Sequence, residues 1–177
     1  MNDEKGLVIL YTGEGKGKTT AALGLVLRAV GYKKKCLIVQ FGKAWFTGEL
    51  VGAKLLSPLV KIIQGGKGFL NILGDKVPLT QHKKAAKEAF DILYNEIKSP
   101  KWDIIVADEI VGANSAGVLP LANVVKLIKA KPQQLDLVLT GHHAHKKLID
   151  MADLVTEMKQ IKHPYQQGIM ARKGVDF

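Results

Sequence analysis

Short, continuously apolar segments recur along this chain and are separated by longer amphipathic ones. The apolar segments predict six strands, at residues 6–12, 35–41, 60–64, 103–108, 136–140 and 153–159. Most of them show no alternation of apolar and polar residues, which is typical of strands buried on both faces of a parallel sheet. The sequence therefore favours a mainly parallel sheet over an antiparallel one.

Helices are predicted between these strands, at residues 18–30, 48–56, 81–98, 121–130 and 144–152. The helix at 81–98 has an apolar stripe along one side, and Thr80 is its expected N-cap residue. Strands that alternate with helices predict an α/β fold with three layers, α/β/α. No linker or repeat divides the chain, so residues 1–177 are predicted to form a single domain, with residues 160–177 as an ordered C-terminal tail.

Polar residues gather where the predicted strands end. They form five clusters, at residues 12–20, 40–43, 64–68, 108–109 and 140–145. The carboxyl ends of parallel strands lie along one edge of a sheet, and ligands of α/β proteins bind at that edge. The sequence therefore predicts one site to which all five clusters contribute. The last cluster includes His142, His143 and His145, which we interpret as a polar loop near the ligand rather than a zinc site.

The first cluster has the composition of a phosphate-binding loop. It reads Thr-Gly-Glu-Gly-Lys-Gly-Lys-Thr-Thr over residues 12–20, between a strand and a helix. Glycines allow the backbone N–H groups to point inward, and the helix N-terminus adds partial positive charge. The common version of this loop has a glycine five positions before Gly17, where this chain has Thr12. The loop predicts a P-loop NTPase fold of the RecA-like type, with a cradle one residue shorter than usual.

Within this loop, Lys18 is placed to reach the outer phosphates and the Thr19 hydroxyl to bind Mg²⁺ or Mn²⁺. The expected partners are Asp108 and Glu109, which follow the apolar run at residues 104–107. A carboxylate at the end of such a strand holds the hydration shell of the metal ion. Glu109 is also a candidate for polarising a water molecule, and the sequence does not separate these two roles.

Composition narrows the class of partner. The net charge of +10 favours anionic ligands, but only two of the 26 basic residues are arginines. Because readers of nucleic acid depend on arginine for bidentate contacts, nucleic acid is not expected as a partner. No apolar run is long enough to span a bilayer, no membrane partner is expected, and we predict a cytoplasmic location. The one cysteine, Cys36, is interpreted as a buried strand residue rather than a nucleophile.

The chain resembles the ATP:corrinoid adenosyltransferases over nearly its whole length. The resemblance is carried by the loop Tyr-Thr-Gly-Glu-Gly-Lys-Gly-Lys-Thr-Thr at 11–20, by Val-Ala-Asp-Glu at 106–109, and by the tail. The tail contains Lys-His-Pro-Tyr at 162–165 and Gly-Ile-Met-Ala-Arg-Lys-Gly-Val-Asp-Phe at 168–177. Tail and short loop together are the most specific part of the match.

The resemblance implies transfer of the 5′-deoxyadenosyl group of ATP to a Co(I) corrinoid, with release of triphosphate, in the synthesis or salvage of adenosylcobalamin. Lys18 and Glu109 are then the candidate catalytic residues, and Thr19, Asp108 and Glu109 the candidate metal ligands. ATP or the corrinoid is expected to contact residues Gly13, Glu14, Gly15, Lys16, Gly17, Lys18, Thr19, Thr20, Arg28, Phe69, His163 and Tyr165. A flavoprotein reductase and a homodimer are the partners that the family suggests.

The chain also departs from the family pattern. Leu70 and Asn71 stand where many relatives have Thr-Trp after the phenylalanine, and His142 replaces an arginine. Arg172 replaces the usual glutamine of the tail. The alternative activity on the same fold is that of a small-molecule kinase or ATPase. A nucleic-acid-binding ATPase of RecA-like type is a third reading, suggested by the positive charge alone.

Overall fold

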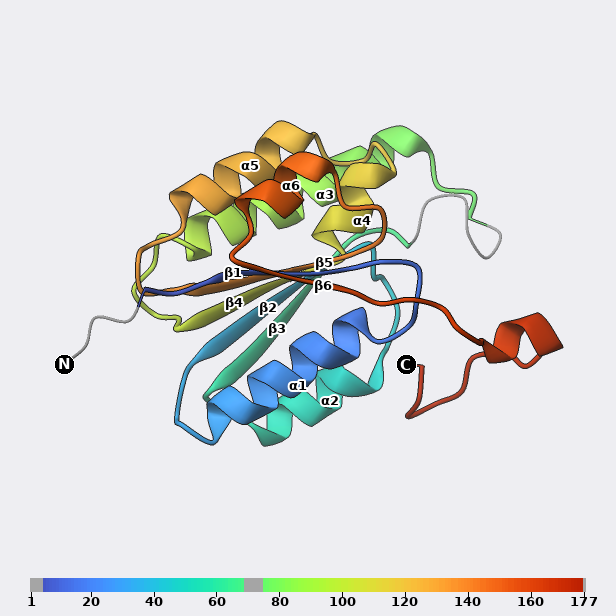
Figure 1. Ribbon diagram of the computed structural model, residues 1–177, viewed down its shortest axis with the longest axis horizontal. Coiled ribbons are helices and arrows are strands. Elements are labelled where there is room, and N and C mark those ends of the chain that lie inside the picture. The colour runs from blue at the N-terminus through green and yellow to red at the C-terminus, as the bar shows by residue number, and fades with distance from the viewer. Residues whose placement is uncertain (1–4, 69–74, 177) are drawn as a thin grey trace.

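The computed structural model describes residues 5–68 and 75–176, and in it a central sheet lies between two layers of helices (Figure 1). The described strands are β1 (Val8–Thr12), β2 (Cys36–Phe41), β3 (Val60–Gly65), β4 (Ile104–Asp108), β5 (Asp136–Thr140) and β6 (Leu154–Glu157). Every neighbouring pair is parallel, in the order β3-β2-β4-β5-β1-β6. The predicted parallel sheet and three-layer architecture are confirmed.

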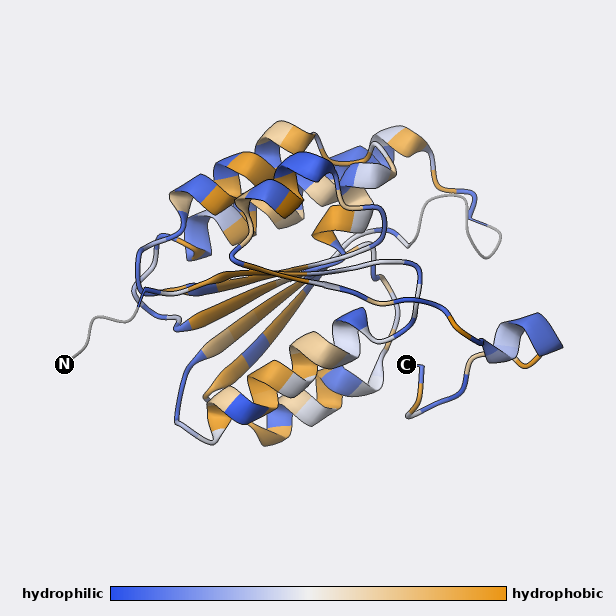
Figure 2. Ribbon diagram, viewed as in Figure 1, coloured by the Kyte–Doolittle hydropathy of each residue, from blue (hydrophilic) through white to orange (hydrophobic). Residues whose placement is uncertain are grey.

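Helices cover both faces of the sheet. On one face lie α1 (Lys18–Val30) and α2 (Gly48–Leu55). The other face carries α3 (Leu79–Glu96), α4 (Ile110–Ser115), α5 (Leu121–Ala130) and α6 (Lys146–Met151) (Figure 1). The strands are apolar along most of their length, and the polar colouring in Figure 2 concentrates at helix surfaces and strand ends.

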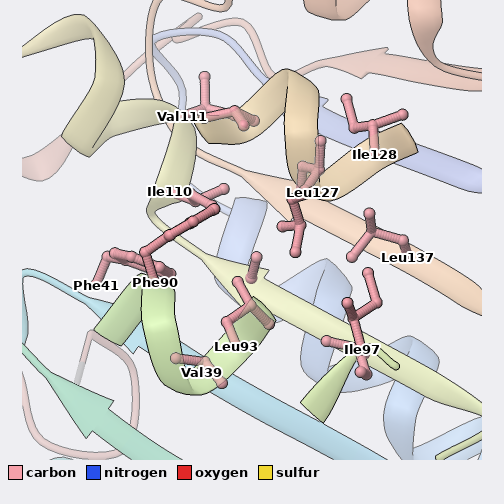
Figure 3. Close-up of a cluster of buried hydrophobic side chains, with 14 of the residues drawn as sticks. Val39, Phe41, Phe90, Leu93, Ile97, Ile110, Val111, Leu127, Ile128 and Leu137 are labelled. Carbon is pink, nitrogen blue, oxygen red and sulfur yellow. The ribbon is translucent and has the colours of Figure 1, made fainter. Parts of the chain in front are cut away.

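The larger hydrophobic core lies between the sheet and the α3–α6 layer. Figure 3 shows its central side chains, contributed by β2, β5, helices α3, α4 and α5 and the C-cap residue of α3: Val39, Phe41, Phe90, Leu93, Ile97, Ile110, Val111, Leu127, Ile128 and Leu137. A smaller core packs α1 against the opposite face, around Ala22, Val26 and Ile38. Because β2 and β4 are buried at every position, the strand ends form a rigid base for the site.

One local prediction was wrong, and one helix was missed. The long helix begins at Leu79, and its N-cap residue is Pro78 rather than Thr80. The carbonyl of Pro78 accepts hydrogen bonds from the backbone N–H groups of Gln81 and His82, at 2.8 and 3.3 Å. Helix α4 was not predicted, because six residues that follow directly on Asp108-Glu109 are too short to show a helical period.

The C-terminal tail begins against the phosphate loop. After β6, the N–H of Met158 donates to the carbonyl of Thr12 at 2.7 Å, and the Met158 carbonyl accepts from Gly15 N–H at 2.7 Å. The tail then carries a short 3-10 helix, η1 (Pro164–Gln167), which stands out from the rest of the chain in Figure 1. Among the described residues, no helix is long and apolar enough to cross a membrane.

Candidate active site

The loop between β1 and α1 closes as a tight cradle. Gly13 and Gly17 have φ angles of 98° and 117°, a region that residues with a side chain rarely adopt. A Cβ at Gly13 would also lie 2.5 Å from the carbonyl oxygen of Met158. The tail therefore packs directly on the outside of the cradle, and both the conformation and the lack of space require glycine at this position.

Lys18 lies inside this cradle. Its side chain is buried, and its Nζ donates to the carbonyls of Gly13 and Gly15 at 2.7 and 2.8 Å. Burial lowers the pKa of Lys18, and the carboxylates of Glu109 and Glu14 oppose that shift. The ammonium group is therefore aimed at the centre of the loop, where it can neutralise a bound polyphosphate.

Asp108 is the buried hub of the site. Its Oδ1 accepts hydrogen bonds from the hydroxyls of Thr19 and Thr140, both at 2.8 Å. Its Oδ2 accepts from Gln40 at 3.3 Å and pairs with Lys43 Nζ, also at 3.3 Å. A carboxylate offers about four lone-pair positions, so this fully buried group is satisfied by protein donors alone. The loop and the ends of β2, β4 and β5 thus meet at one carboxylate.

A hydrogen-bonded row extends from Asp108 toward the sheet edge. Gln64 on β3 donates to the side-chain oxygen of Gln40 at 3.1 Å, which leaves the Gln40 amide NH₂ to donate to Asp108 and Glu49. Lys43 Nζ lies 2.9 Å from Glu49 Oε1. Burial would raise the pKa of Glu49, but hydrogen bonds from Gln40 and Lys43 outweigh it and lower the value to about 2.

The carboxylates of Asp108 and Glu49 shift the pKa of Lys43. Burial would lower the pKa of Lys43, but the charges of Asp108 and Glu49 raise it above its ordinary value. Lys43 and Glu49 are therefore a charged pair beneath the site. Sequence reasoning singled out neither residue, although it did identify the cluster at residues 40–43. In the sequence, Glu49 lies in α2 and outside every polar cluster at a strand end, so no local signal connected it with Asp108.

Glu109 occupies a strained position beside Asp108. Its φ is 61°, and its backbone N–H donates to the Thr140 hydroxyl at 2.8 Å. Burial raises the pKa of Glu109 to about 7, with a further contribution from the charge of Asp108, while Lys18 and Lys43 act in the opposite direction. The Glu109 carboxyl therefore binds a proton more readily than an ordinary glutamate. A non-glycine residue at positive φ next to a phosphate loop is typical of a functional position.

The donor set fits a hard divalent cation. The Thr19 hydroxyl gives its proton to Asp108, so its lone pairs remain available to a metal ion in the mouth of the loop. Because the four positions of Asp108 are used, this carboxylate suits the role of orienting Thr19 and metal-bound water rather than direct coordination. Oxygen ligands of this kind, with several retained waters, are what Mg²⁺ prefers in proteins.

A cavity of about 400 Å³ opens on the other side of Glu109. Its walls come from the ends of β2 and β3, from α3 and from α4, and they are mostly apolar: Phe41, Gly42, Gly66, Lys67, Gly68, His82, Ala86, Glu109, Gly112, Ala113, Ser115, Ala116, Val118, His142 and His143. Its volume lies within the usual range for small-molecule sites. Glu109 and His142 therefore separate a charged cradle from an apolar chamber.

The turn after β5 contacts the phosphate loop across this boundary. Nδ1 of His142 and of His143 lie 3.6 and 3.2 Å from the two carboxylate oxygens of Glu14. Burial lowers the pKa of His142, and the nearby charge of Lys18 lowers it further. The interpretation of these histidines as a polar loop near the ligand site agrees with their position.

Some predicted contact residues lie elsewhere. Arg28 is in the last turn of α1, ten residues beyond Lys18 and so about 15 Å along the helix axis, too far to reach the cradle of its own chain. Tyr165 belongs to η1 and His163 is its N-cap residue, and η1 has no buried residue to pack it against the sheet. The structure does not bring these three residues to the loop. Phe69 lies outside the described residues.

The structure also places Lys16, Thr20 and Cys36, the other residues singled out from the sequence. Lys16 points toward the tail, where its Nζ donates to the Val175 carbonyl at 2.7 Å and pairs with the Asp176 carboxylate. Thr20 is exposed in the first turn of α1. Cys36 is a buried residue of β2, as predicted, and burial together with Asp103 raises its pKa to about 11.

Comparison with solved structures agrees with the three-layer fold. Among solved structures, the fold is similar to that of a KaiC-like protein, PH0186 from Pyrococcus horikoshii OT3, with a TM-score of 0.58 and 15% identity over 89% of this chain and 75% of that one. At that identity the likeness shows the fold alone, which is the predicted P-loop, RecA-like one.

Sequence relatives identify the family. A corrinoid adenosyltransferase from Sinorhizobium sp is 38% identical over 99% of this chain and 82% of its own length. The corrinoid adenosyltransferase of Escherichia coli K12 is 34% identical over 99% of this chain and 87% of its own length. Residues 4–177 match the family described as ATP:corrinoid adenosyltransferase BtuR/CobO/CobP. The chain belongs to the ATP:corrinoid adenosyltransferase family.

Proposed function

We propose that this protein transfers the 5′-deoxyadenosyl group of ATP to the Co(I) of a corrinoid and releases triphosphate. The observation that carries the proposal is a polyphosphate cradle joined to an apolar cavity by Glu109 and His142, in a chain of this family. Co(I) supplies the electron pair of the new bond to C5′. The C5′–O5′ bond breaks, and O5′ leaves with the triphosphate.

The phosphate-binding cradle binds the triphosphate, which is the leaving group of the reaction. Lys18, the inward N–H groups of the glycine loop and the N-terminus of α1 together neutralise the triphosphate. When ATP binds, its phosphates take the place of the Gly13 and Gly15 carbonyls as partners of Lys18. Because the nucleophile is cobalt, no nucleophilic side chain is needed, in agreement with the burial and raised pKa of Cys36.

A divalent cation, Mg²⁺ or Mn²⁺, is part of the proposal. It would be held by the Thr19 hydroxyl, with Asp108 orienting that hydroxyl and Glu109 as the further candidate ligand. Such an ion would supply positive charge to the triphosphate oxygens.

The cavity is proposed to receive the adenosyl group and the cobalt-bearing face of the corrinoid. Its apolar walls exclude water, which protects both Co(I) and the activated nucleotide from side reactions. Positioning of the two reactants in one chamber then accounts for much of the rate. A flavoprotein reductase and a homodimer, both suggested by the family resemblance, belong to the same proposal, as does the cytoplasmic location predicted from the sequence.

The direct test is an anaerobic assay of cobalt–carbon bond formation. Purified protein is mixed with Mg·ATP and chemically reduced cobalamin, and the absorbance change that accompanies alkylation is followed. Formation of adenosylcobalamin at a rate proportional to enzyme supports the proposal. Absence of the alkylated product, together with ATP hydrolysis, would favour the kinase or ATPase alternative.

A further inference from the structure

The segment between β2 and α2 connects the phosphate-binding cradle with the apolar cavity. Residues 42–47 begin at Gly42, which lines the cavity, and end at Thr47, the N-cap residue of α2. Lys43 of this segment is mostly buried, with 12% of its side chain exposed, and bridges Asp108 and Glu49. One ammonium group therefore contacts both the hub of the phosphate site and the helix that follows the cavity wall.

The segment forms part of the cavity wall through tight backbone packing. Gly42 N–H donates to the Gly65 carbonyl at 3.0 Å, and a Cβ on Gly66 would lie 2.7 Å from the backbone of Gly42. The Trp45 carbonyl accepts from Gln64 Nε2 at 3.3 Å, and the Trp45 ring lies 3.9 Å from where a Cβ on Gly68 would be. A shift of the segment would therefore change the shape of the chamber.

One side chain of the segment lacks a hydrogen-bond partner. Thr47 is 2% exposed, and its hydroxyl is the buried side-chain atom without a hydrogen-bond partner within residues 5–68 and 75–176. An unsatisfied buried hydroxyl is unfavourable. The segment therefore carries a cost that a different arrangement of Thr47 would relieve.

We propose that Lys43 is a positioning residue that holds Asp108 beneath Thr19 and couples the triphosphate end of the site to the segment 42–47, which reaches the cavity wall at Gly42. Lys43 contacts Oδ2 of Asp108, and this leaves Oδ1 to orient the Thr19 hydroxyl. Glu49 fixes the other side of the ammonium group. Binding of Mg·ATP at Thr19 then acts through Asp108 and Lys43 on the segment that carries Trp45.

This inference rests on the proposed binding of Mg·ATP, and its test separates the two. The chain has two tryptophans, so Trp102→Phe leaves Trp45 as the single reporter. In that background, ATP binding is measured by calorimetry as a function of Mg²⁺ concentration, and Trp45 fluorescence is recorded at saturation. The variants are Lys43→Met, Lys43→Arg and Asp108→Asn, with Lys54→Met, an exposed lysine of α2, as the matched control.

The expected result is that Lys43→Met raises the Mg²⁺ concentration for half-saturation about tenfold and abolishes the change in Trp45 fluorescence. Lys43→Arg should recover part of both, and Lys54→Met should behave as the parent. In the Asp108→Asn background, Lys43→Met should have no further effect on the Mg²⁺ requirement. Should Lys43→Met fail to fold, Lys43→Arg decides, with a smaller rise in the Mg²⁺ requirement and a reduced fluorescence change expected.

Three results would overturn the inference. The first is an unchanged Mg²⁺ requirement in Lys43→Met, and the second is a full fluorescence change in that variant. The third is an equal effect of Lys43→Met with and without Asp108→Asn. That third result would make Lys43 a structural anchor of α2. If Mg·ATP binding leaves the Trp45 fluorescence of the parent protein unchanged, that result also contradicts the coupling between the phosphate site and residues 42–47. Failure of the parent to bind Mg·ATP would instead remove the proposed function itself.

Discussion

The two halves of the active site are built on opposite principles. At the triphosphate end, nearly every polar atom has a protein partner, and Asp108 alone receives contacts from Thr19, Gln40, Lys43 and Thr140. At the cavity end, the walls are mostly apolar side chains and glycine backbone, with Glu109 and the histidines at the boundary. The first half is preorganised to hold charge, and the second is shaped to exclude water.

The difference predicts where a substitution is most costly. A charged cradle depends on individual ammonium and hydroxyl groups, so loss of one of them removes a specific interaction. An apolar chamber depends on the shape that many side chains and glycine backbone form together, so a small change at one position alters its fit to a ligand rather than removing one specific interaction. Substitutions in the two halves should therefore differ in the size and in the kind of their effects.

The largest effect is expected for Lys18→Ala. Loss of the ammonium leaves the triphosphate under-neutralised, and one such charge-assisted contact is worth about 1.5–3 kcal/mol, or more for charge in the transition state. Adenosyl transfer at limiting ATP should fall at least about tenfold to a hundredfold. Lys101→Ala, which changes an exposed lysine at the opposite edge of the sheet, is the control. A Lys18→Ala variant with more than half the parent rate would contradict the assignment.

A smaller effect, on stability, is expected for Gly13→Ala. The new Cβ would meet the Met158 carbonyl, and the φ of 98° is unfavourable for alanine, so a loss of about 1–3 kcal/mol is expected. Gly24→Ala is the matched control, because its Cβ would meet nothing within 4 Å in the middle of α1. It should stabilise the protein by about 0.5–1 kcal/mol. Urea unfolding measures both, and equal stability of the two variants would argue against the packing of the tail on the loop.

On the cavity side, Gly112→Ala should act on Glu109 and little on the fold. A Cβ at Gly112 would lie 2.4 Å from Glu109 Oε2, the flexible end of a side chain that can move aside. The free energy of unfolding should change by less than about 1 kcal/mol, while the KM for the corrinoid changes more than the KM for ATP. Steady-state kinetics with each substrate varied in turn provides the test. Equal changes in both KM values would show that the two halves are not separable.

The smallest effect is a pH dependence of stability that comes from Glu49. Its pKa in the folded protein is lowered to about 2 from an ordinary value near 4.5, so its contribution is present above pH 4.5 and is lost as the pH falls toward 2. The stability difference between the parent and Glu49→Gln should therefore shrink over that range. Thermal unfolding at pH 6, 4 and 3 measures it, and a constant difference would mean that the charge of Glu49 is unimportant.

The parts of the site differed in how well the sequence predicted them. The cradle could be predicted because its chemistry is local: Gly13, Lys18 and Thr19 lie close together in the chain, and Asp108 ends an apolar strand. The network of Lys43 and Glu49 could not, because Glu49 on α2 meets Gln40 and Lys43 only in the folded chain. Arg28 lies about three turns of helix beyond the loop, and its predicted contact with ATP or the corrinoid stays a prediction.

The measurement that tests the account most directly is the identity of the phosphate product. Phosphorus NMR of an anaerobic reaction with ATP and Co(I) cobalamin distinguishes triphosphate from ADP and phosphate. Intact triphosphate is expected, in a one-to-one ratio with the cobalt–carbon bonds formed, because Lys18 and Thr19 hold the leaving group while C5′ faces the cavity. Accumulation of ADP in step with turnover, without a cobalt–carbon bond, would contradict it.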